Sequence, residues 1–358
     1  MKKTVGVIFG GQSGEHEVSL MSATSILRVI DREKFDVVHI GISKNGNWYL
    51  YNGEIEDIQK GNWEKNSIKA FLPPDSSYKG VVTLQNGVEK IHKLDVVFPV
   101  LHGPRGEDGS IQGLFELAGI PYVSCGVLSS AMCMDKVIAK KMLEYESLPI
   151  AEWIYYYDYE LSKEEEMIVK DIETRFGYPC FVKPANLGSS VGITKAKNRA
   201  ELINALKLAA KYDRKIIVEE FIDGREIEIS VLGNDSPRAS ITGEIIPCHE
   251  FYDYTAKYFD NGQSKLLIPA PIPEEVEKTI QDFAIKAFKA LGCEGMARVD
   301  FFYQESKKRV LINELNTIPG FTKISMYPKL WEASGLNYKD LITELINLAI
   351  ERYEKSIR

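Results

Sequence analysis

Two short segments near the carboxyl end of the chain alternate apolar and polar residues, as the two strands of a hairpin do. These segments are Ala297-Arg298-Val299-Asp300 and Asn313-Glu314-Leu315-Asn316. Because side chains alternate between the two faces of a strand, Arg298 and Asp300 share one face of the first segment. Glu314 and Asn316 share one face of the second, and the polar residues 303–309 are suited to the turn between them. The pattern therefore predicts two carboxylates, an amide oxygen and a guanidinium in one site.

This set of side chains suits a magnesium site beside a developing negative charge. Proteins bind Mg²⁺ through one or two carboxylates together with substrate phosphates, and a fixed arginine can stabilise an oxyanion. Salt bridges on a surface hairpin are the alternative interpretation. The neighbours of these charges are apolar on both faces, namely Val299, Phe301, Phe302, Leu311 and Ile312. We therefore expect the charges to be partly buried, which requires a functional reason.

A glycine- and serine-rich loop follows a predicted strand at 180–184. Lys183 lies near the end of this strand, and the loop reads Asn186-Leu187-Gly188-Ser189-Ser190-Val191-Gly192. Glycine has no Cβ and successive N–H groups form an anion-binding nest, so such a loop can approach phosphate oxygens closely. The Walker A order of residues is absent, and a plain β-turn is the alternative.

The segment Ile217–Ile222 alternates apolar and acidic residues in the manner of a strand. The exposed backbone of such a strand can hydrogen-bond an adenine, with Phe221 and Ile222 against its rings. Glu226 could then accept a hydrogen bond from a ribose hydroxyl. A solvated strand face is the alternative explanation for Glu219 and its acidic neighbour.

Two loops in the amino-terminal part combine glycine with charge. The first, Gly10-Gly11-Gln12-Ser13-Gly14-Glu15, lacks the dinucleotide fingerprint Gly-x-Gly-x-x-Gly. In a cleft Glu15 could bind a substrate ammonium, although acids at the start of a helix also serve as caps. The second loop, 102–109, begins with His102 and is too polar and glycine-rich for an ordinary connection. A structural histidine in a simple turn is the alternative there.

Aromatic and charged residues interleave in the segment 251–265, which includes Lys257 and Tyr258. A segment of this kind before a glycine-containing turn predicts a loop that closes over a ligand. A solvent-facing hairpin is the alternative.

The composition argues against several classes of protein. A net charge of −7 does not favour binding to a nucleic-acid backbone. No apolar run approaches the roughly 20 residues that a membrane span needs. The five scattered cysteines never form Cys-x-x-Cys, a pattern typical of reduced thiols in the cytoplasm and not of a disulfide framework or a zinc site.

A chain of 358 residues exceeds the usual size of one core, so we expect several domains. Strand patterns at 4–9, 37–42 and 96–101, with a helix at 17–29, predict a parallel sheet. Residues 44–92 are expected to form an irregular insertion or small hairpins, and one helix is expected to begin at Ser129. We divide the chain into three α/β units, at 1–125, 126–216 and 217–358.

Taken together, these segments resemble the ATP-grasp superfamily, and within it the D-alanine–D-alanine ligases. The resemblance extends from Phe9-Gly10-Gly11 to Pro319-Gly320-Phe321-Thr322 and keeps six motifs in order. It implies an amino-terminal parallel-sheet domain that binds substrate, with ATP held between the central and carboxyl-terminal α+β domains. It also implies a cytoplasmic homodimer that synthesises a peptidoglycan precursor for cell wall biogenesis and cell shape.

The resemblance assigns a role to each matching residue. ATP would contact Lys136, Lys183, Ser189, Ser190, Val191, Glu219, Phe221, Ile222, Glu226, Lys257 and Asn313. Two Mg²⁺ (or Mn²⁺) ions would be bound by Asp300, Glu314 and Asn316. The first D-alanine would contact Glu15 and His102, and the second Ser325 and Met326. Arg298 and the Gly320 backbone would form the oxyanion site, and Glu15, Ser190 and Tyr258 a hydrogen-bonded set that joins the closing loop to the amino-terminal domain.

The expected reaction is the ATP-dependent joining of two D-alanine molecules through a D-alanyl phosphate. Tyr258 favours D-alanine as second substrate, because relatives that make D-alanyl-D-lactate lack this tyrosine. A D-alanine–D-serine or D-alanine–D-lactate ligase is the alternative within the family. Outside it, a dinucleotide-dependent oxidoreductase would use the Gly10-Gly11 loop, and a nucleotide-binding sensor would lack the metal ligands that this chain has.

Overall fold

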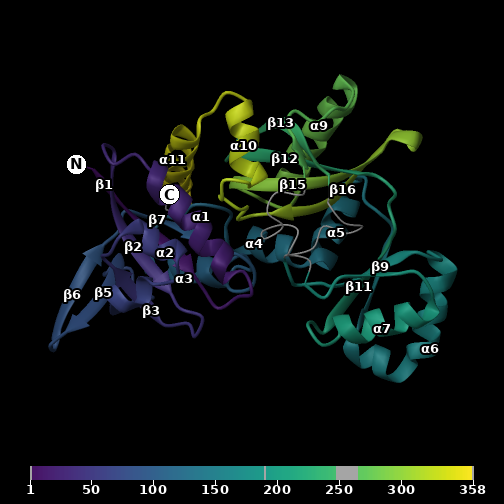
Figure 1. Ribbon diagram of the computed structural model, residues 1–358, viewed down its shortest axis with the longest axis horizontal. Coiled ribbons are helices and arrows are strands. Elements are labelled where there is room, and N and C mark those ends of the chain that lie inside the picture. Colours follow the sequence, from purple (N-terminus) through teal and green to yellow (C-terminus); the bar gives the residue numbers. More distant parts are fainter. Residues whose placement is uncertain (1, 189–190, 247–264, 357–358) are drawn as a thin grey trace.

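The computed structural model describes residues 2–188, 191–246 and 265–356 and contains three β-sheets with helices packed around them (Figure 1). The sheets are built from residues 3–100, 153–220 and 225–316. Strand β11, Lys215–Glu220, belongs to the second sheet and spans residue 216. The division of the chain at 125 and 216 stays a prediction.

The first sheet has seven strands in the order β6-β5-β4-β3-β2-β1-β7. Its strands are β1 (Lys3–Gly10), β2 (Phe35–Ile42), β3 (Trp48–Tyr51), β4 (Ser67–Phe71), β5 (Gly80–Gln85), β6 (Val88–Lys93) and β7 (Val96–Val100). Helices α1 (His16–Val29), α2 (Ile55–Gln59) and α3 (Ser110–Ala118) and a 3₁₀ helix (Trp63–Asn66) accompany it. Only β1, β2 and β7 run parallel to one another.

The prediction of a parallel sheet is therefore confirmed for the three predicted strands. Of the two possibilities for the segment 44–92, the small hairpins are correct and the irregular insertion is wrong, because the segment adds β3 to β6 as antiparallel strands beside β2. These strands are short, and β6 is exposed along almost its whole length. A strand without a buried face has no reason to alternate apolar and polar residues, so the pattern left no clear signal.

The second sheet has four antiparallel strands in the order β10-β9-β11-β8. The other strands are β8 (Trp153–Tyr157), β9 (Cys180–Pro184) and β10 (Thr194–Ala196), and α6 (Asp158–Arg175) and α7 (Arg199–Ala209) pack on it. The segment before it forms two helices, α4 (Val127–Met134) and α5 (Lys136–Tyr145), and not one helix from Ser129. Asp135 separates them, because its carboxylate accepts hydrogen bonds from the N–H groups of Val137 and Ile138 and so caps α5.

The third sheet has five antiparallel strands in the order β14-β13-β12-β15-β16. They are β12 (Arg225–Gly233), β13 (Arg238–Ile246), β14 (Lys265–Leu267), β15 (Gly295–Gln304) and β16 (Arg309–Asn316), with a 3₁₀ turn at Glu305–Lys307. Helices α9 (Glu274–Ala290), α10 (Met326–Ala333) and α11 (Tyr338–Ser356) follow the sheet or pack on it. The predicted hairpin is confirmed, since Arg298 lies opposite Asn316 and Asp300 lies opposite Glu314.

The last helix, α11, packs against α1 and β7 at the other end of the chain (Figure 1). Leu341, Ile342 and Leu345 share one hydrophobic core with Val5 and Phe98. The same core includes Ile318 and Phe321, from the loop that follows β16. The first and third sheets are therefore joined by continuous apolar packing. No helix among the described residues is long and apolar enough to cross a membrane.

Candidate active site

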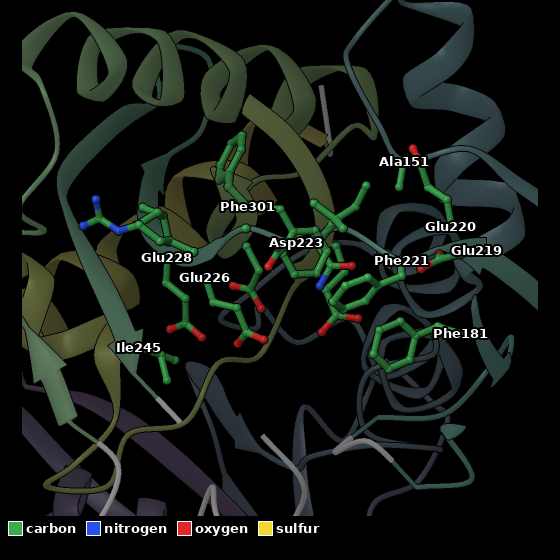
Figure 2. Close-up of a pocket in the computed structure, with 18 of the residues that line it drawn as sticks. Ala151, Phe181, Glu219, Glu220, Phe221, Asp223, Glu226, Glu228, Ile245 and Phe301 are labelled. Carbon is green, nitrogen blue, oxygen red and sulfur yellow. The ribbon is translucent and has the colours of Figure 1, made fainter. Parts of the chain in front are cut away.

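A cavity with a volume of about 470 Å³ lies between the second and third sheets (Figure 2). Such a volume falls within the range of about 300–1,000 Å³ usual for small-molecule sites. Strands β9 and β11 supply one wall, and β12, β15 and β16 the other. Six of the residues predicted to contact ATP line it: Lys183, Glu219, Phe221, Ile222, Glu226 and Asn313. The metal-ligand candidates Asp300 and Glu314 line it as well.

A buried group of two lysines and one glutamate forms the first wall; we call Lys140, Lys183 and Glu219 the lysine cluster. Lys183 Nζ donates to Glu219 Oε2 at 2.6 Å, and Lys140 Nζ lies 3.1 Å from Glu219 Oε1. All three residues are buried. Burial acts to raise the pKa of Glu219, but the two ammonium groups outweigh it and hold that pKa at about 2. The carboxylate therefore stays charged, and the cluster carries a net charge of about +1.

Lys140 was not among the predicted site residues. It lies on α5 one turn beyond Lys136, so both side chains emerge from one face of the helix. Lys136 Nζ donates to the Leu187 carbonyl at 2.6 Å and lies 3.8 Å from Glu314 Oε2. The four-residue spacing of the two lysines was a signal that the sequence contained.

The predicted hairpin supplies a second group, which we call the acidic cluster: Glu228, Arg298, Asp300, Glu314 and Asn316. Arg298 donates from Nε and Nη2 to the two oxygens of Asp300, at 2.7 and 2.8 Å. Arg298 Nε also lies 3.1 Å from Glu228 Oε2, and Asn316 Nδ2 donates to Asp300 at 3.1 Å. Two carboxylates thus share one guanidinium, and the third, Glu314, lies near Lys136. Glu228 was missed because its strand, β12, pairs with β15 from about 70 residues away in the chain.

The acidic cluster fits a divalent cation that is held partly by a ligand. No group of three or more His, Cys, Asp or Glu residues suited to a metal occurs in the described part of the chain. Asp300 and Glu314 lie opposite each other on paired strands and Asn316 is two residues further on, so the protein offers two carboxylates and one amide. Mg²⁺ usually takes only one or two carboxylates and completes its shell with phosphates and water.

Aromatic rings mark the apolar end of the cavity. Phe181 and Phe221 lie next to each other, away from Glu228 at the other end (Figure 2). Their ring centroids are 6.1 Å apart, and Lys195 Nζ lies 4.1 Å from the centre of the Phe221 ring. Phe181 was not predicted, although it is on the same strand as Lys183 and two residues away, which places both side chains on one face.

A second cavity lies beyond Arg298 and brings together the residues predicted to bind substrate. Glu15, His102, Arg298, Gly320, Ser325 and Met326 all line it. Glu15 and His102 are buried. Burial lowers the pKa of His102, although Glu15 opposes this, so the imidazole is neutral. Gly320 admits no side chain, because a Cβ there would lie 2.7 Å from Ser325 Oγ.

Glu107 lines this second cavity and was also missed by the sequence analysis. Its two carboxylate oxygens accept hydrogen bonds from the N–H groups of Gly103, at 2.6 Å, and Ile318, at 3.2 Å. Burial, followed by the nearby charge of Glu15, raises the pKa of Glu107 to about 8.

Some predicted residues are not placed in either cavity. Ser189, Ser190, Lys257 and Tyr258 lie outside the described residues. Val191 is exposed, its N–H donates to the Gly188 carbonyl at 3.3 Å, and it lines neither of the two cavities. Lys136 lines a smaller third cavity, together with Glu314, which lines both of the others, and with Glu107 and Asn316, which line the second.

Comparison with known proteins identifies relatives along the whole chain. The family described as "D-ala D-ala ligase N-terminus" matches residues 4–125, and "D-ala D-ala ligase C-terminus" matches residues 142–347. The chain is 57% identical to the D-alanine–D-alanine ligase of Thermoanaerobacter sp., over 100% of this chain and 99% of the relative. It is 54% identical to that of Acetivibrio thermocellus, over 100% of this chain and 98% of the relative.

Solved structures with the same fold include two ligases. The VanG D-Ala:D-Ser ligase from Enterococcus faecalis superimposes with a TM-score of 0.88 at 43% identity, covering 98% of this chain and 100% of the other. The D-alanine–D-alanine ligase from Coxiella burnetii superimposes with a TM-score of 0.86 at 39% identity, covering 99% and 97%. These likenesses confirm the predicted ATP-grasp architecture. With both family halves matched in order and relatives of more than 50% identity along its full length, the chain belongs to the D-alanine–D-alanine ligase family.

Proposed function

We propose that the two connected cavities carry out the ATP-dependent ligation of two D-alanine molecules to D-alanyl-D-alanine, for peptidoglycan synthesis. The observation that carries this assignment is the position of Arg298. It lines the cavity that contains Glu15 and Gly320, and it donates two hydrogen bonds to Asp300, which lines the cavity that contains Lys183 and Glu219. A nucleotide in the first cavity and an amino acid in the second would then meet at the acidic cluster.

ATP is expected to lie with its base at the aromatic end of the first cavity. Phe181, Phe221 and Ile222 offer apolar contact there, and Glu226 is placed to accept a hydrogen bond from ribose. Lys183 and Lys136 lie toward the acidic cluster and would contact the phosphates. Ser189, Ser190, Val191 and Lys257 are proposed to cover them, as the family resemblance implies.

Two Mg²⁺ or Mn²⁺ ions are proposed to be held by Asp300, Glu314 and Asn316 together with the phosphates. Bound there, they would neutralise phosphate charge during transfer of the γ-phosphoryl group. Arg298 holds the Asp300 carboxylate by two hydrogen bonds and so fixes its orientation before any ligand arrives.

The chemical difficulty of the reaction is that a carboxylate repels an amine nucleophile. Transfer of the γ-phosphoryl group of ATP to the first D-alanine yields D-alanyl phosphate, and the second amine then displaces phosphate. Glu15 would bind the ammonium of the first D-alanine and His102 would lie near its carboxylate, with Ser325 and Met326 near the second substrate. The tetrahedral oxyanion would face Arg298 and the N–H of Gly320.

D-Alanine is proposed as the second substrate in preference to D-serine or D-lactate. The curated relatives cited above are D-alanine–D-alanine ligases, and Tyr258 matches the dipeptide-forming pattern. The D-serine alternative retains one argument, since the VanG structure at 43% identity is described as a D-Ala:D-Ser ligase. D-Lactate is less favoured because its attacking group is a hydroxyl, and the amine of D-alanine attacks an acyl phosphate more readily than a hydroxyl does.

Mass spectrometry of the products tests this assignment. The purified protein is incubated with ATP, Mg²⁺ and D-alanine, alone and with D-serine or D-lactate in competition. A dominant D-alanyl-D-alanine product is the expected result. A mixed dipeptide or depsipeptide would refute the second-substrate assignment, and the lack of any ATP-dependent product would refute the site.

A cytoplasmic homodimer is proposed from the family resemblance. The four cysteines of the described residues, Cys125, Cys133, Cys180 and Cys293, are free thiols, which agrees with a reducing compartment. Sedimentation analysis of the purified protein tests the dimer.

A further inference from the structure

The loop that follows β16 carries Gly320, whose N–H is proposed to face the oxyanion. This loop reads Ile318-Pro319-Gly320-Phe321, and side chains form hydrogen bonds with its backbone on both sides of Gly320. Ile318 N–H donates to Glu107 and the Ile318 carbonyl lies 3.0 Å from His102 Nδ1. Phe321 N–H donates to Ser22 Oγ at 3.2 Å. All three partner side chains belong to the amino-terminal part of the chain.

Ser22 and His102 are themselves bonded, so the contacts form a closed ring. His102 Nε2 lies 3.3 Å from Ser22 Oγ, and Ser22 is completely buried on α1. A carbonyl oxygen cannot donate, so His102 must carry its proton on Nδ1, where it faces Ile318. Its Nε2 is then an acceptor, and the Ser22 hydroxyl donates to it. The same Ser22 oxygen accepts from Phe321, so every donor in the ring has an acceptor.

This ring uses both nitrogens of His102. A neutral imidazole has one donor and one acceptor, and here each is taken by a protein group. Direct recognition of a substrate carboxylate by His102 would require one of these bonds to break. The geometry therefore favours a role in which His102 holds the loop.

We propose that Ser22, His102 and Glu107 are positioning residues that clamp the loop 318–321 and so fix the Gly320 N–H at the oxyanion site. This inference rests on the proposed oxyanion role of Gly320. Ser22 is its least expected member, because it touches no cavity described above and acts only through its two partners. The amino-terminal sheet thereby sets the geometry of a group that belongs, by sequence, to the metal-binding end of the chain.

Replacing Ser22 by alanine tests the clamp, with Ser19→Ala as the matched control. Ser19 is also fully buried on α1, one turn earlier, and its hydroxyl accepts from Gly10 N–H and donates to the Val100 carbonyl. Both variants lose one buried hydroxyl, but only Ser22→Ala loses a bond to the loop 318–321.

For Ser22→Ala we expect kcat for dipeptide formation to fall about tenfold, the value for one lost positioning bond of about 1.4 kcal/mol. The KM for ATP should not change. Because a misplaced oxyanion donor slows attack on D-alanyl phosphate, water competes, and the ratio of ADP released to dipeptide formed should rise above one. Ser19→Ala should keep that ratio at the wild-type value.

His102→Asn provides the second variant, since the asparagine Nδ2 can take the place of Nδ1 toward Ile318 while the link to Ser22 is lost. If the ring exists, the Ser22→Ala and His102→Asn effects on kcat are less than additive. Additive effects, or a Ser22→Ala variant that matches Ser19→Ala in its ADP-to-dipeptide ratio, would overturn the clamp. A wild-type protein that forms no dipeptide would instead overturn the proposed function on which the clamp rests.

Discussion

The two charged clusters beside the first cavity, where we propose that ATP binds, differ in how completely their charges are balanced. In the lysine cluster two ammonium groups enclose one carboxylate, and all three residues are buried. In the acidic cluster one guanidinium pairs with two carboxylates, and the third, Glu314, lies 3.8 Å from Lys136 and keeps 28% of its side chain exposed. In the lysine cluster the ammonium groups exceed the carboxylates by one. In the acidic cluster the carboxylates exceed the guanidinium by two, and a bound cation would offset this negative charge.

Because of this difference, we expect mutations in the two clusters to affect different properties, namely the stability of the fold and the activity. A buried ion pair that loses one member leaves an uncompensated charge in the protein interior, so it destabilises the fold. A cluster with excess like charge loses repulsion when one member is neutralised, so its fold is little affected. Neutralising the carboxylate of the lysine cluster should therefore lower stability. Neutralising a carboxylate of the acidic cluster should instead act mainly on activity.

Neutralising the glutamate of the lysine cluster should have the largest effect. In Glu219→Gln, Lys140 and Lys183 lose their shared counterion, and the free energy of unfolding should fall by about 3–5 kcal/mol. Urea denaturation measures it. The control is Glu220→Gln on the same strand, whose carboxylate is half-buried and accepts from the Glu152 N–H. Equal losses in the two variants would contradict the distinction between the clusters.

Removing the guanidinium of the acidic cluster should act strongly on turnover, and it should also lower stability because Glu228 and Asp300 lose their shared counterion. Loss of one oxyanion donor typically costs about 2.7–4 kcal/mol, or about 10²–10³-fold in kcat, and we expect this range for Arg298→Ala. The dissociation constant for ATP, measured by calorimetry, should stay near the wild-type value. Arg309→Ala, at the start of β16, is the control on the same hairpin. A large loss of ATP affinity in Arg298→Ala would move this residue out of the oxyanion role.

Neutralising Glu314 tests whether the acidic cluster is short of positive charge. Glu314→Gln should lower the free energy of unfolding by no more than about 1 kcal/mol, because its ion pair with Lys136 is 3.8 Å long and the Glu314 side chain is 28% exposed. The Mg²⁺ concentration for half-maximal activity should rise at least about tenfold, or 1.4 kcal/mol. Titration of activity with Mg²⁺ gives this value, and an unchanged requirement would exclude Glu314 as a ligand.

The smallest expected effect is a change with pH in the stability difference between the wild type and Glu219→Gln. The pKa of Glu219 is about 2 in the fold, below its ordinary value of 4.5. A depressed carboxyl pKa adds stability above the ordinary pKa, and this contribution is lost as the pH falls through 4.5 toward 2. The stability gap between the wild type and Glu219→Gln should therefore be full at pH 6 and narrow by pH 3.5. A gap that stays constant would mean that the lysines do not hold the charge of Glu219.

What the sequence could predict depended on how far apart the interacting residues lie. Arg298, Asp300, Glu314 and Asn316 share one hairpin, and period-two alternation places them without any knowledge of the rest. Glu228 joins them through pairing between β12 and β15, and Glu107 through a loop of the amino-terminal part. No local pattern encodes such contacts.

The strands within 44–92 were expected only as possible small hairpins, without bounds, for a different reason. They are short, and β6 has no buried face, so hydrophobic periodicity and length did not distinguish them from loops. Lys140 and Phe181 could have been found, because each follows from simple periodicity beside a residue that was already named. The roles of Ser189, Ser190, Lys257 and Tyr258 stay predictions of the family resemblance.

The packing of α11 into the core of the first sheet also bears on how the protein is synthesised. Residues 338–356 complete an apolar core that residues 5–35 begin, so the amino-terminal sheet emerges from the ribosome without one of its layers. At about 5–20 residues per second, the remaining chain takes on the order of ten seconds or more to follow. During that interval the apolar surface of β1 and β7 that α11 covers in the folded protein is exposed. The loop 318–321 packs in the same core, so the proposed oxyanion site forms only after residues 338–356 have been synthesised.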